Sequence, residues 1–486
     1  MKKDKLFCII MGASGDLARR KIFPALFSLY CQGFLPDDCG IVGFARTDQS
    51  VDSFRNFIKE KLTCRYSPPS DCSRQMEEFI AKCHYYRGEY ASADSMLGLY
   101  QFIKSLCGDS PYNKIFYMAV PPEVFKDISF SLGNAGLISC RRAEPWTRVV
   151  IEKPFGYDRR SSDILADELL KVFTDDQIYR IDHYLGKEMI QNLLVLRFAN
   201  IIFEPLWSRK YVQRIHIQWE ENLSVAGRGG YFDKTGIIRD VIQNHLMQIC
   251  ALTTMEPPRN MTASVVAREK VRILRSIIPP SLNDCMLGQY RDGVLGGRTF
   301  AAYRGEQGVR ADSIVPTFAA IFLRINNKRW QDVPIFVSAG KGLSASKTEI
   351  RIVFKSIDKN IFCNSQGCPL QNELVVRVQP DEAIYYKITS KVPGLAIELG
   401  DALIDLKYHE AYKKIIPDAY ERLLLDVILG DKTLFIGNDE LGAAWDIFTP
   451  LLHEIDAKRP VPEFYPFGVD SAVLMKAFFG KYGIKN

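Results

Sequence analysis

The sequence has no apolar run near the ~18 residues that a membrane-spanning helix requires. The apolar run after Lys2, Lys3 and Lys5 is short and ends in a glycine turn, which is not the pattern of a targeting signal. We therefore expect a cytoplasmic protein that has no membrane segment.

Charge of one sign is not concentrated anywhere in the sequence. The net charge of +6 is spread over 486 residues, without a basic block or a recognisable nucleic-acid-binding module. The mild excess favours small anionic ligands over nucleic acid. We expect no nucleic-acid partner.

Cysteine is too rare to hold the fold together. Twelve cysteines in so long a chain cannot form a disulfide scaffold, and the spacing from Cys363 to Cys368 matches no zinc ribbon. We therefore expect reduced thiols and no bound metal.

What remains is the composition of a globular protein, 47% apolar and 25% charged, in a chain long enough for two or three domains. In the first 180 residues, short apolar runs that end at glycine or proline alternate with helical segments. This alternation predicts a Rossmann-type, doubly wound parallel sheet. Its predicted strands cover 6–12, 40–46, 114–120 and 148–156, and a helix covers 17–31.

The second part of the chain has successive strands with few helices between them. This order predicts a large, mostly antiparallel sheet with flanking helices, so the fold class is α/β followed by α+β. The strands are expected at 214–221, 318–326, 334–340, 349–355 and 373–380, and the helices at 237–252 and 417–429. We expect one domain over 1–178 and a second over 179–486.

A glycine motif, GASGDLA, joins the first predicted strand to the first predicted helix. It departs from the usual Gly-x-Gly-x-x-Gly fingerprint, but its glycines still let the backbone approach a pyrophosphate at a helix N-terminus. The alternative is a tight turn that binds nothing. The place between a strand and an amphipathic helix favours a nucleotide. The candidate cofactor-binding residues are Gly12, Ala13, Ser14, Gly15, Asp16 and Leu17.

Two further strand ends meet the same edge of this sheet. NAD-preferring sites usually place an acidic residue after the second strand, where this chain has Arg46 and Thr47. A guanidinium can bind a 2′-phosphate, so NADP is favoured over NAD; a surface arginine is the alternative. Lys153 precedes a proline that keeps its backbone extended, so it can reach across the cleft or simply remain solvated.

The segment RIDHYLGKE, residues 180–188, places donors and a cation before a helical stretch. His183 and Lys187 are four residues apart, which puts them on one face near a helix start, and Tyr184 adds a hydroxyl. Such a group suits a phosphate monoester. The alternative is a capped helix start, with Asp182 as the N-cap and a solvated lysine.

His245 lies four residues after Val241, on or beside the buried stripe of a predicted helix. A lone histidine at such a position is more often a core residue than a catalyst. An adjacent carboxylate changes that by making the imidazole more basic and fixing its tautomer. Asp182 is the candidate partner, although the sequence alone does not bring the two together.

Several motifs in order give the chain a family likeness. They are GASGDLA, EKPFG, RIDHYLGKE, NLLVLRFAN, GRGGYFD, GIIRDVIQNHLMQ, LGQY, RVQP and PDAYERLLLDV. From about Leu6 to about Pro460, the chain closely resembles glucose-6-phosphate dehydrogenases. RIDHYLGKE is very specific to that family.

The resemblance implies oxidation of glucose 6-phosphate at C1 to 6-phospho-D-glucono-1,5-lactone with NADP, the first step of the oxidative pentose phosphate pathway. His245 matches the general base and Asp182 its dyad partner. Members of the family are typically homodimers or homotetramers that pair through the large sheet. The matching substrate-binding residues are Lys153, His183, Tyr184, Lys187, Glu221, Asp240, Lys341 and Gln379, with Lys153 between substrate and cofactor.

Three positions depart from the family pattern. Ser346 stands where animal-type members have a phosphate-contacting arginine, and Phe125 replaces a cofactor-contacting tyrosine. Ser338 replaces an arginine of the second, structural NADP site of some eukaryotic members, and the C-terminal aromatic segment is short. The sequence therefore does not predict that second site, although other residues match parts of it: Lys347, Arg351, Arg377, Tyr385, Lys387 and Asp405.

Two rival interpretations remain. One is a sugar-phosphate isomerase or epimerase with a tightly bound nucleotide, which would not reduce NADP in solution. The other is a silent paralogue that serves as a binding subunit. Retention of Asp182, His183, Lys187 and His245 together argues against the second rival.

Overall fold

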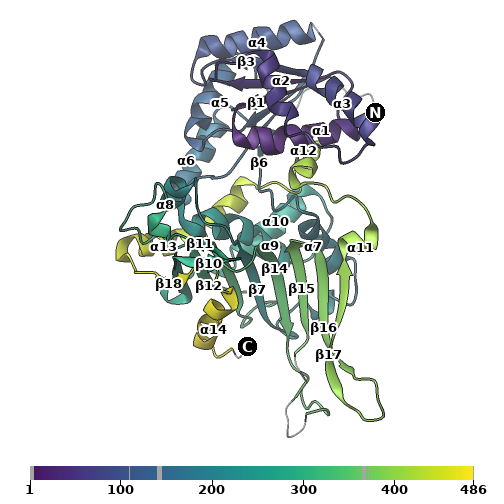
Figure 1. The fold of residues 1–486 in the computed structure, drawn as a ribbon, viewed down its shortest axis with the longest axis vertical. Helices are drawn as coiled ribbons and strands as arrows, with labels where there is room; N and C mark the ends of the chain where they lie inside the picture. The colour runs from purple at the N-terminus through teal and green to yellow at the C-terminus, as the bar shows by residue number, and fades with distance from the viewer. Residues whose placement is uncertain (1–4, 109, 140–144, 364–367, 370, 485–486) are drawn as a thin grey trace.

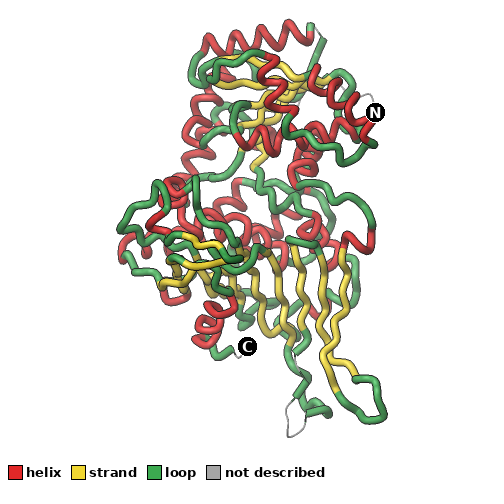
Figure 2. Tube along the Cα trace, in the orientation of Figure 1, coloured by secondary structure: helices red, strands yellow, loops and turns green. Residues whose placement is uncertain are grey.

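The computed structural model describes residues 5–108, 110–139, 145–363, 368–369 and 371–484. Two sheets dominate the structure, one in the N-terminal part and one in the C-terminal part (Figure 1). In Figure 2 the strands of the first sheet lie among helices, whereas the long strands of the second sheet extend beyond them. None of the helices in the described ranges is both long and apolar enough to cross a membrane.

The first sheet is six-stranded and parallel, as the sequence predicts. Its order is β3-β2-β1-β4-β5-β6, with β1 at the point where the direction of winding reverses. Two of its strands were not expected: β3 alternates between buried and half-buried residues, and β6 has only three residues. The strands are β1 Leu6–Met11, β2 Cys39–Ala45, β3 Cys83–Arg87, β4 Asn113–Met118, β5 Thr147–Ile151 and β6 Ile178–Arg180.

The helices of this part bury an apolar stripe against the sheet. In α4, Met96, Leu99 and Ile103 are buried at helical spacing. The helices are η1 Ala18–Ile22, α1 Phe23–Cys31, α2 Val51–Lys59, α3 Pro69–Ala81, α4 Ala93–Cys107, α5 Phe125–Asn134 and α6 Arg159–Leu170. The helix predicted over 17–31 is therefore present, as η1 and α1 together.

The second sheet has ten strands in the order β17-β16-β15-β14-β7-β13-β12-β9-β18, with β8 paired to β12. Its pairs are antiparallel except for β7 with β13 and β9 with β18, so the predicted mostly antiparallel sheet is confirmed. The strands are β7 Val212–Glu220, β8 Ile277–Ile278, β9 Cys285–Arg291, β12 Phe318–Ile325, β13 Ile335–Gly340, β14 Lys347–Phe354, β15 Glu373–Gln379, β16 Ala383–Lys391, β17 Leu399–Lys407 and β18 Glu463–Pro466; β10 Gly293–Leu295 and β11 Arg298–Phe300 form a separate hairpin.

Helices line this second sheet and separate it from the first. The predicted helix over 237–252 is found as η5 and α9, and it begins after a sharp break at Gly236, where φ is 66°. The helices are α7 Glu188–Phe198, α8 Gly229–Ile237, η5 Ile238–Leu246, α9 Met247–Thr254, α10 Ala263–Leu274, α11 Tyr408–Tyr412, α12 Ala419–Leu429, α13 Asn438–Lys458 and α14 Ser471–Lys481.

The helix expected to start at Asp182 starts later. Residues 181–187 form turns, and α7 begins at Glu188. Two contacts explain the delay: the side chain of Asp182 accepts a hydrogen bond from the backbone N–H of Tyr184, and Gly186 packs against the carbonyl of Ala419. A Cβ at Gly186 would lie 2.5 Å from that oxygen. His183 and Lys187 therefore lie on a tight turn and not on a helix face.

The prediction that all cysteines are reduced thiols is wrong in the structure. Cys64 pairs with Cys72, and Cys363 pairs with Cys368. The prediction depended on the low cysteine count, whereas both bridges join cysteines close in sequence, with Cα atoms 5.8 and 4.2 Å apart. Neither bridge is part of a scaffold for the whole fold.

Helix α12 fastens the two parts of the chain together. Arg148 on β5 donates to the carbonyls of Val427 and Ile428 at the end of α12, at 2.6 and 2.8 Å. At the other end of α12, Glu421 accepts from Arg65 and Tyr66. Figure 1 shows α12 beside α1, far from its neighbours in sequence. The division at residue 178 remains a prediction.

Candidate active site

The glycine motif lies where β1, β2 and β4 end. Gly12 has φ +85°, and a Cβ there would lie 2.3 Å from the carbonyl oxygen of Ala119. The Gly15 amide donates to the Gly12 carbonyl at 2.9 Å, and the Ser14 hydroxyl lies 2.8 Å from that of Thr47. The bare backbone at the carboxyl edge of a parallel sheet fits the pyrophosphate of a dinucleotide.

Arg46 follows β2 and is exposed, with its guanidinium 5.5 Å from the ring centre of Tyr90. The nearby carboxylate of Asp48 pairs instead with Arg87, at 3.0 Å. Within the described ranges, Arg46 has no ion-pair partner. Arg46 is therefore available for a 2′-phosphate, and Asp48 is engaged elsewhere.

Asp182 and His245 are brought together in the interior. Nδ1 of His245 lies 2.5 Å from Oδ1 of Asp182, and both side chains are almost fully buried. Asp182 comes from the turn after β6, and His245 from η5. From the sequence alone this pair was only a candidate, because its two residues are 63 positions apart.

The charges of this pair favour a carboxylate beside a neutral imidazole. Burial alone raises the pKa of Asp182, but His245 and the Tyr184 amide more than reverse this and hold it below its usual range. Burial lowers the pKa of His245, against the opposing effect of Asp182. Since an ionised Asp182 accepts from Nδ1, the proton of neutral His245 sits there and Nε2 is left as the basic atom.

The expected phosphate-binding residues divide between two environments. His183 and Lys187 line a cavity of about 570 Å³ that Leu17 of the glycine motif also lines. Tyr184 is buried, and its hydroxyl accepts from Trp219 at 2.6 Å and lies 3.3 Å from the hydroxyl of Thr348. Its ring centre lies 4.6 Å from that of His245, so Tyr184 links the dyad to the second sheet.

The other predicted substrate residues form polar pairs nearby. Lys153 donates to the backbone carbonyl of Asp240 at 2.6 Å and lies 3.3 Å from its carboxylate. Lys341 donates to Glu221 at 2.5 Å, and Gln379 donates to the Tyr184 hydroxyl at 3.3 Å. Together these pairs place cations and carboxylates from both sheets around the dyad.

Sequence reasoning missed two residues of this region. The ring of Tyr420 lies parallel to His183 at 6.2 Å between centres, and Tyr420 also lines the large cavity. Glu152, next to Lys153, accepts from Tyr117 at 2.6 Å, and its burial raises its pKa to about 7. Motif PDAYERLLLDV contains Tyr420 and EKPFG contains Glu152, but nothing in either motif indicates its position.

Asp182, His183 and His245 also have the spacing of a three-ligand metal site, since one ligand atom of each lies within 4.8 Å of the others. The short Asp182–His245 hydrogen bond uses one atom of each for the other. These donors fit a proton-transfer dyad better than a zinc site with an open position.

The positions that depart from the family pattern have local partners. Ser346 bonds to Asn222, with distances of 3.0 and 2.7 Å, and Ser338 lies 2.8 Å from Nε2 of His216. Phe125 is buried. The cations that match the second NADP site already pair with carboxylates: Lys347 with Glu220, Arg351 and Arg377 with Glu349, and Lys387 with Glu373. Tyr385 lies against Arg377, and Asp405 against Lys407.

Comparisons with known proteins agree on one family. Residues 9–192 match the family model described as glucose-6-phosphate dehydrogenase, NAD binding domain, and residues 194–485 match the C-terminal domain of the same family. The chain belongs to the glucose-6-phosphate dehydrogenase family. This family consists of oxidoreductases, so the predicted enzyme class and a nicotinamide-nucleotide domain are confirmed.

Individual relatives and a solved structure support the assignment. The chain is 47% identical to glucose-6-phosphate 1-dehydrogenase 3, chloroplastic, of Arabidopsis thaliana, over 94% of this chain and 76% of that protein. A solved glucose-6-phosphate dehydrogenase in complex with its substrate glucose-6-phosphate covers 100% of this chain and 99% of its own, with 39% identity and a TM-score of 0.92. Another A. thaliana relative, 40% identical over 99% of this chain and 75% of that protein, is named an inactive glucose-6-phosphate 1-dehydrogenase 4, chloroplastic.

The expected cytoplasmic localisation is contradicted by these comparisons. Five plant relatives, 44–47% identical, are all named chloroplastic. The expectation came from the charge and apolar pattern of the first residues alone, and that pattern carries no information on a plastid address.

Proposed function

We propose that this protein oxidises D-glucose 6-phosphate at C1 to 6-phospho-D-glucono-1,5-lactone and that NADP takes the hydride. The buried Asp182–His245 hydrogen bond carries this proposal, because it presents one basic nitrogen beside a cavity with phosphate-binding side chains. The membership of the chain in the glucose-6-phosphate dehydrogenase family supports the substrate. The reaction is the first step of the oxidative pentose phosphate pathway.

His245 acts as the general base. Its Nε2 takes the proton of the C1 hydroxyl, since Nδ1 is committed to Asp182. Asp182 keeps the imidazole in that tautomer and stabilises the imidazolium that forms. The burial of both groups excludes water from the proton transfer.

His183 and Lys187 hold the phosphate at the far end of the sugar. Both side chains line the cavity of about 570 Å³. The ammonium group of Lys187 can form a charge-assisted hydrogen bond with a phosphate oxygen. Burial lowers the pKa of Lys187, while Asp418 and Glu382 oppose this effect. Tyr184 supports His183 by packing against it and against His245, whose ring also contacts His183 directly. Glu221, Asp240, Lys341 and Gln379 contact the sugar.

The chain's own residues fit NADP. The Gly12–Leu17 turn would hold the pyrophosphate and Arg46 the 2′-phosphate, with Lys153 between cofactor and substrate. When bound, the nicotinamide supplies an acceptor for the hydride that leaves C1. Gly12 allows the turn itself to form, because its φ is +85° and any side chain there would meet the Ala119 carbonyl.

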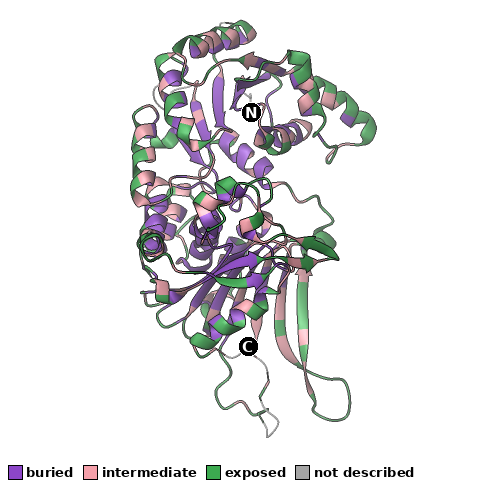
Figure 3. Ribbon diagram, turned by 60° about the vertical axis from the view of Figure 1, so that its left-hand side comes forward, coloured by how far each residue is buried: buried purple, intermediate pink, exposed green. Residues whose placement is uncertain are grey.

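We also propose that the protein is a homodimer or homotetramer that pairs through the ten-stranded sheet. Strands β16 and β17 at its edge carry exposed and half-buried residues, whereas the central strands are buried (Figure 3). Leu403 and Ile404 are apolar residues more than half exposed there. Sedimentation velocity tests this proposal, and a monomer at micromolar concentration would exclude it.

The alternative interpretation, a catalytically silent paralogue, has a precedent, since one relative is named inactive. In this chain, the intact dyad and Lys187 favour activity. The isomerase rival is excluded if NADP is reduced in solution. The deciding experiment follows NADPH absorbance with glucose 6-phosphate and compares NADP with NAD. The absence of turnover with either nucleotide would end the proposal.

A further inference from the structure

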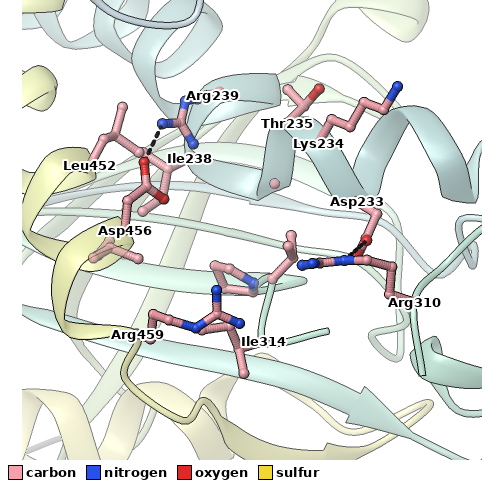
Figure 4. Close-up of a pocket in the computed structure, with 14 residues that line it drawn as sticks. Asp233, Lys234, Thr235, Ile238, Arg239, Arg310, Ile314, Leu452, Asp456 and Arg459 are labelled. Carbon is pink, nitrogen blue, oxygen red and sulfur yellow. Dashed lines mark hydrogen bonds and ion pairs between the residues drawn. The ribbon is translucent and has the colours of Figure 1, made fainter. Parts of the chain in front are cut away.

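A second, smaller cavity of about 170 Å³ lies beside the first turn of η5, the helix that carries His245 (Figure 4). Its lining shares no residue with the cavity that His183 and Lys187 reach. The walls come from three separate places: the start of η5 with Arg239, the segment before β12 with Arg310, and the end of α13 with Asp456 and Arg459.

Basic side chains outnumber acidic ones around this cavity. The lining includes two carboxylates, Asp233 and Asp456, and four cations: Lys234, Arg239, Arg310 and Arg459. Asp456 is engaged by Arg239 at 3.1 Å. Asp233 accepts from Arg310 at 3.2 Å and from the hydroxyls of Tyr303 and Ser313 as well. The acidic groups are therefore already committed, and positive charge is left over.

Arg459 carries the unbalanced charge. It ends α13 in the left-handed backbone region, with φ 45°, and no carboxylate of the described residues pairs with its guanidinium. Figure 4 shows the guanidinium groups of Arg310 and Arg459 extending toward each other, while Lys234 points away. Arg310 already has a carboxylate partner in Asp233, so an anion in this cavity would neutralise chiefly Arg459.

We propose that this cavity binds a small phosphate dianion, either inorganic phosphate or the phosphate group of a small ester, between Arg310 and Arg459. Planar guanidinium groups bind phosphate through paired hydrogen bonds. Arg239 provides a third guanidinium group on the adjacent wall of the cavity. The volume is too small for a dinucleotide or a drug-sized ligand. The site is separate from the substrate-phosphate residues on the turn before α7.

The test is titration calorimetry of the full chain with inorganic phosphate and with glycerol 3-phosphate, at constant ionic strength. Arg310→Gln/Arg459→Gln should lose one phosphate-binding event that the unchanged protein and Arg298→Gln, an exposed arginine on β11, both retain. Lys187→Gln should lose a different event and keep this one. Binding of inorganic phosphate alone identifies the ion as the ligand, and binding of the ester as well identifies a phosphate monoester.

Arg459→Gln alone keeps the Asp233–Arg310 pair and should weaken phosphate binding about tenfold or more. Circular dichroism and the melting temperature should match the unchanged protein, since Arg459 is exposed. If the double variant binds the same number of phosphates with the same affinity as the unchanged protein, no such site exists.

Discussion

Nδ1 of His245 and Oδ1 of Asp182 lie 2.5 Å apart, although one residue is on a helix of the second part and the other follows the last strand of the first sheet. The proposed proton-transfer dyad therefore draws one residue from each part of the chain. If the dyad acts as proposed, catalysis requires the correct relative placement of the two parts as well as both groups.

Replacing His245 by Asn should lower kcat by ~10²–10⁴-fold or more, because the base is lost while the shape is nearly kept. The KM for glucose 6-phosphate should change little, since the phosphate-binding side chains remain. Steady-state NADPH formation measures both constants. Full activity in this variant would show that another group is the base.

Asp182→Asn should reduce kcat and also change its pH dependence. The neutral imidazole is the active form, so activity falls as acid protonates it; burial lowers the pKa of His245, and Asp182 works against this. Without the carboxylate the pKa falls further, and the acid limb of kcat/KM moves to lower pH. Asp284→Asn, which changes a buried carboxylate outside the candidate site, should leave the profile in place. A limb that moved to higher pH would contradict the dyad.

Lys187→Gln should raise the KM for glucose 6-phosphate by about 10–100-fold, since a charge-assisted hydrogen bond to phosphate is lost. Oxidation of unphosphorylated glucose, followed in the same assay, should be unaffected. The matched control is Lys171→Gln, which removes an exposed lysine paired with Glu168 on α6. Equal losses with both sugars would mean that Lys187 does not bind the phosphate.

Arg46→Ala should weaken the preference for NADP. The guanidinium has no carboxylate partner in the described ranges and lies over Tyr90, so kcat/KM with NADP should fall about 10–100-fold while NAD is little affected. Arg87→Ala, which frees Asp48, serves as the neighbouring control. Parallel losses with both nucleotides would point to a structural role for Arg46.

A stability prediction concerns a buried ion pair between α10 and α13. Lys270 and Glu440 lie 2.5 Å apart, and both are at most 1% exposed. Glu440→Gln should lower the free energy of unfolding by about 3–5 kcal/mol, because it leaves Lys270 charged and unpaired. Denaturant titration measures this, and Lys270→Met/Glu440→Leu should recover much of the loss. No loss in the single variant would show that the ion pair does not stabilise the fold.

The strands with long apolar runs could be predicted from the sequence, because burial on both faces leaves a continuous pattern. β1 and β2 are fully buried and were placed to within about a residue of their observed bounds. β3 and β6 could not be found, since one is only partly buried and the other has three residues. β16 and β17 carry mostly exposed or half-buried side chains, so neither alternation nor a run marks them.

Within the site, the local motifs were predictable and the long-range contacts were not. The turn at Gly12 follows from a glycine after a buried strand. The position of Tyr420 beside His183 depends on how α12 docks, which no local pattern records. The same holds for Gly186. Its contact with the Ala419 carbonyl is one reason why α7 begins at Glu188 and not near Asp182.

Arg148 anchors the end of α12 to the first sheet, and this has a practical consequence for dissecting the molecule. A fragment that stops near residue 178 would keep the entire parallel sheet except part of β6 and yet lose the helix that covers it. In that fragment, the guanidinium of Arg148 would lack its two carbonyl acceptors. The apolar side chains of α1 that contact α12 would be exposed to water. Recombinant work on the nucleotide-binding half therefore calls for a design that supplies residues 417–436 as a second segment, joined or added in trans.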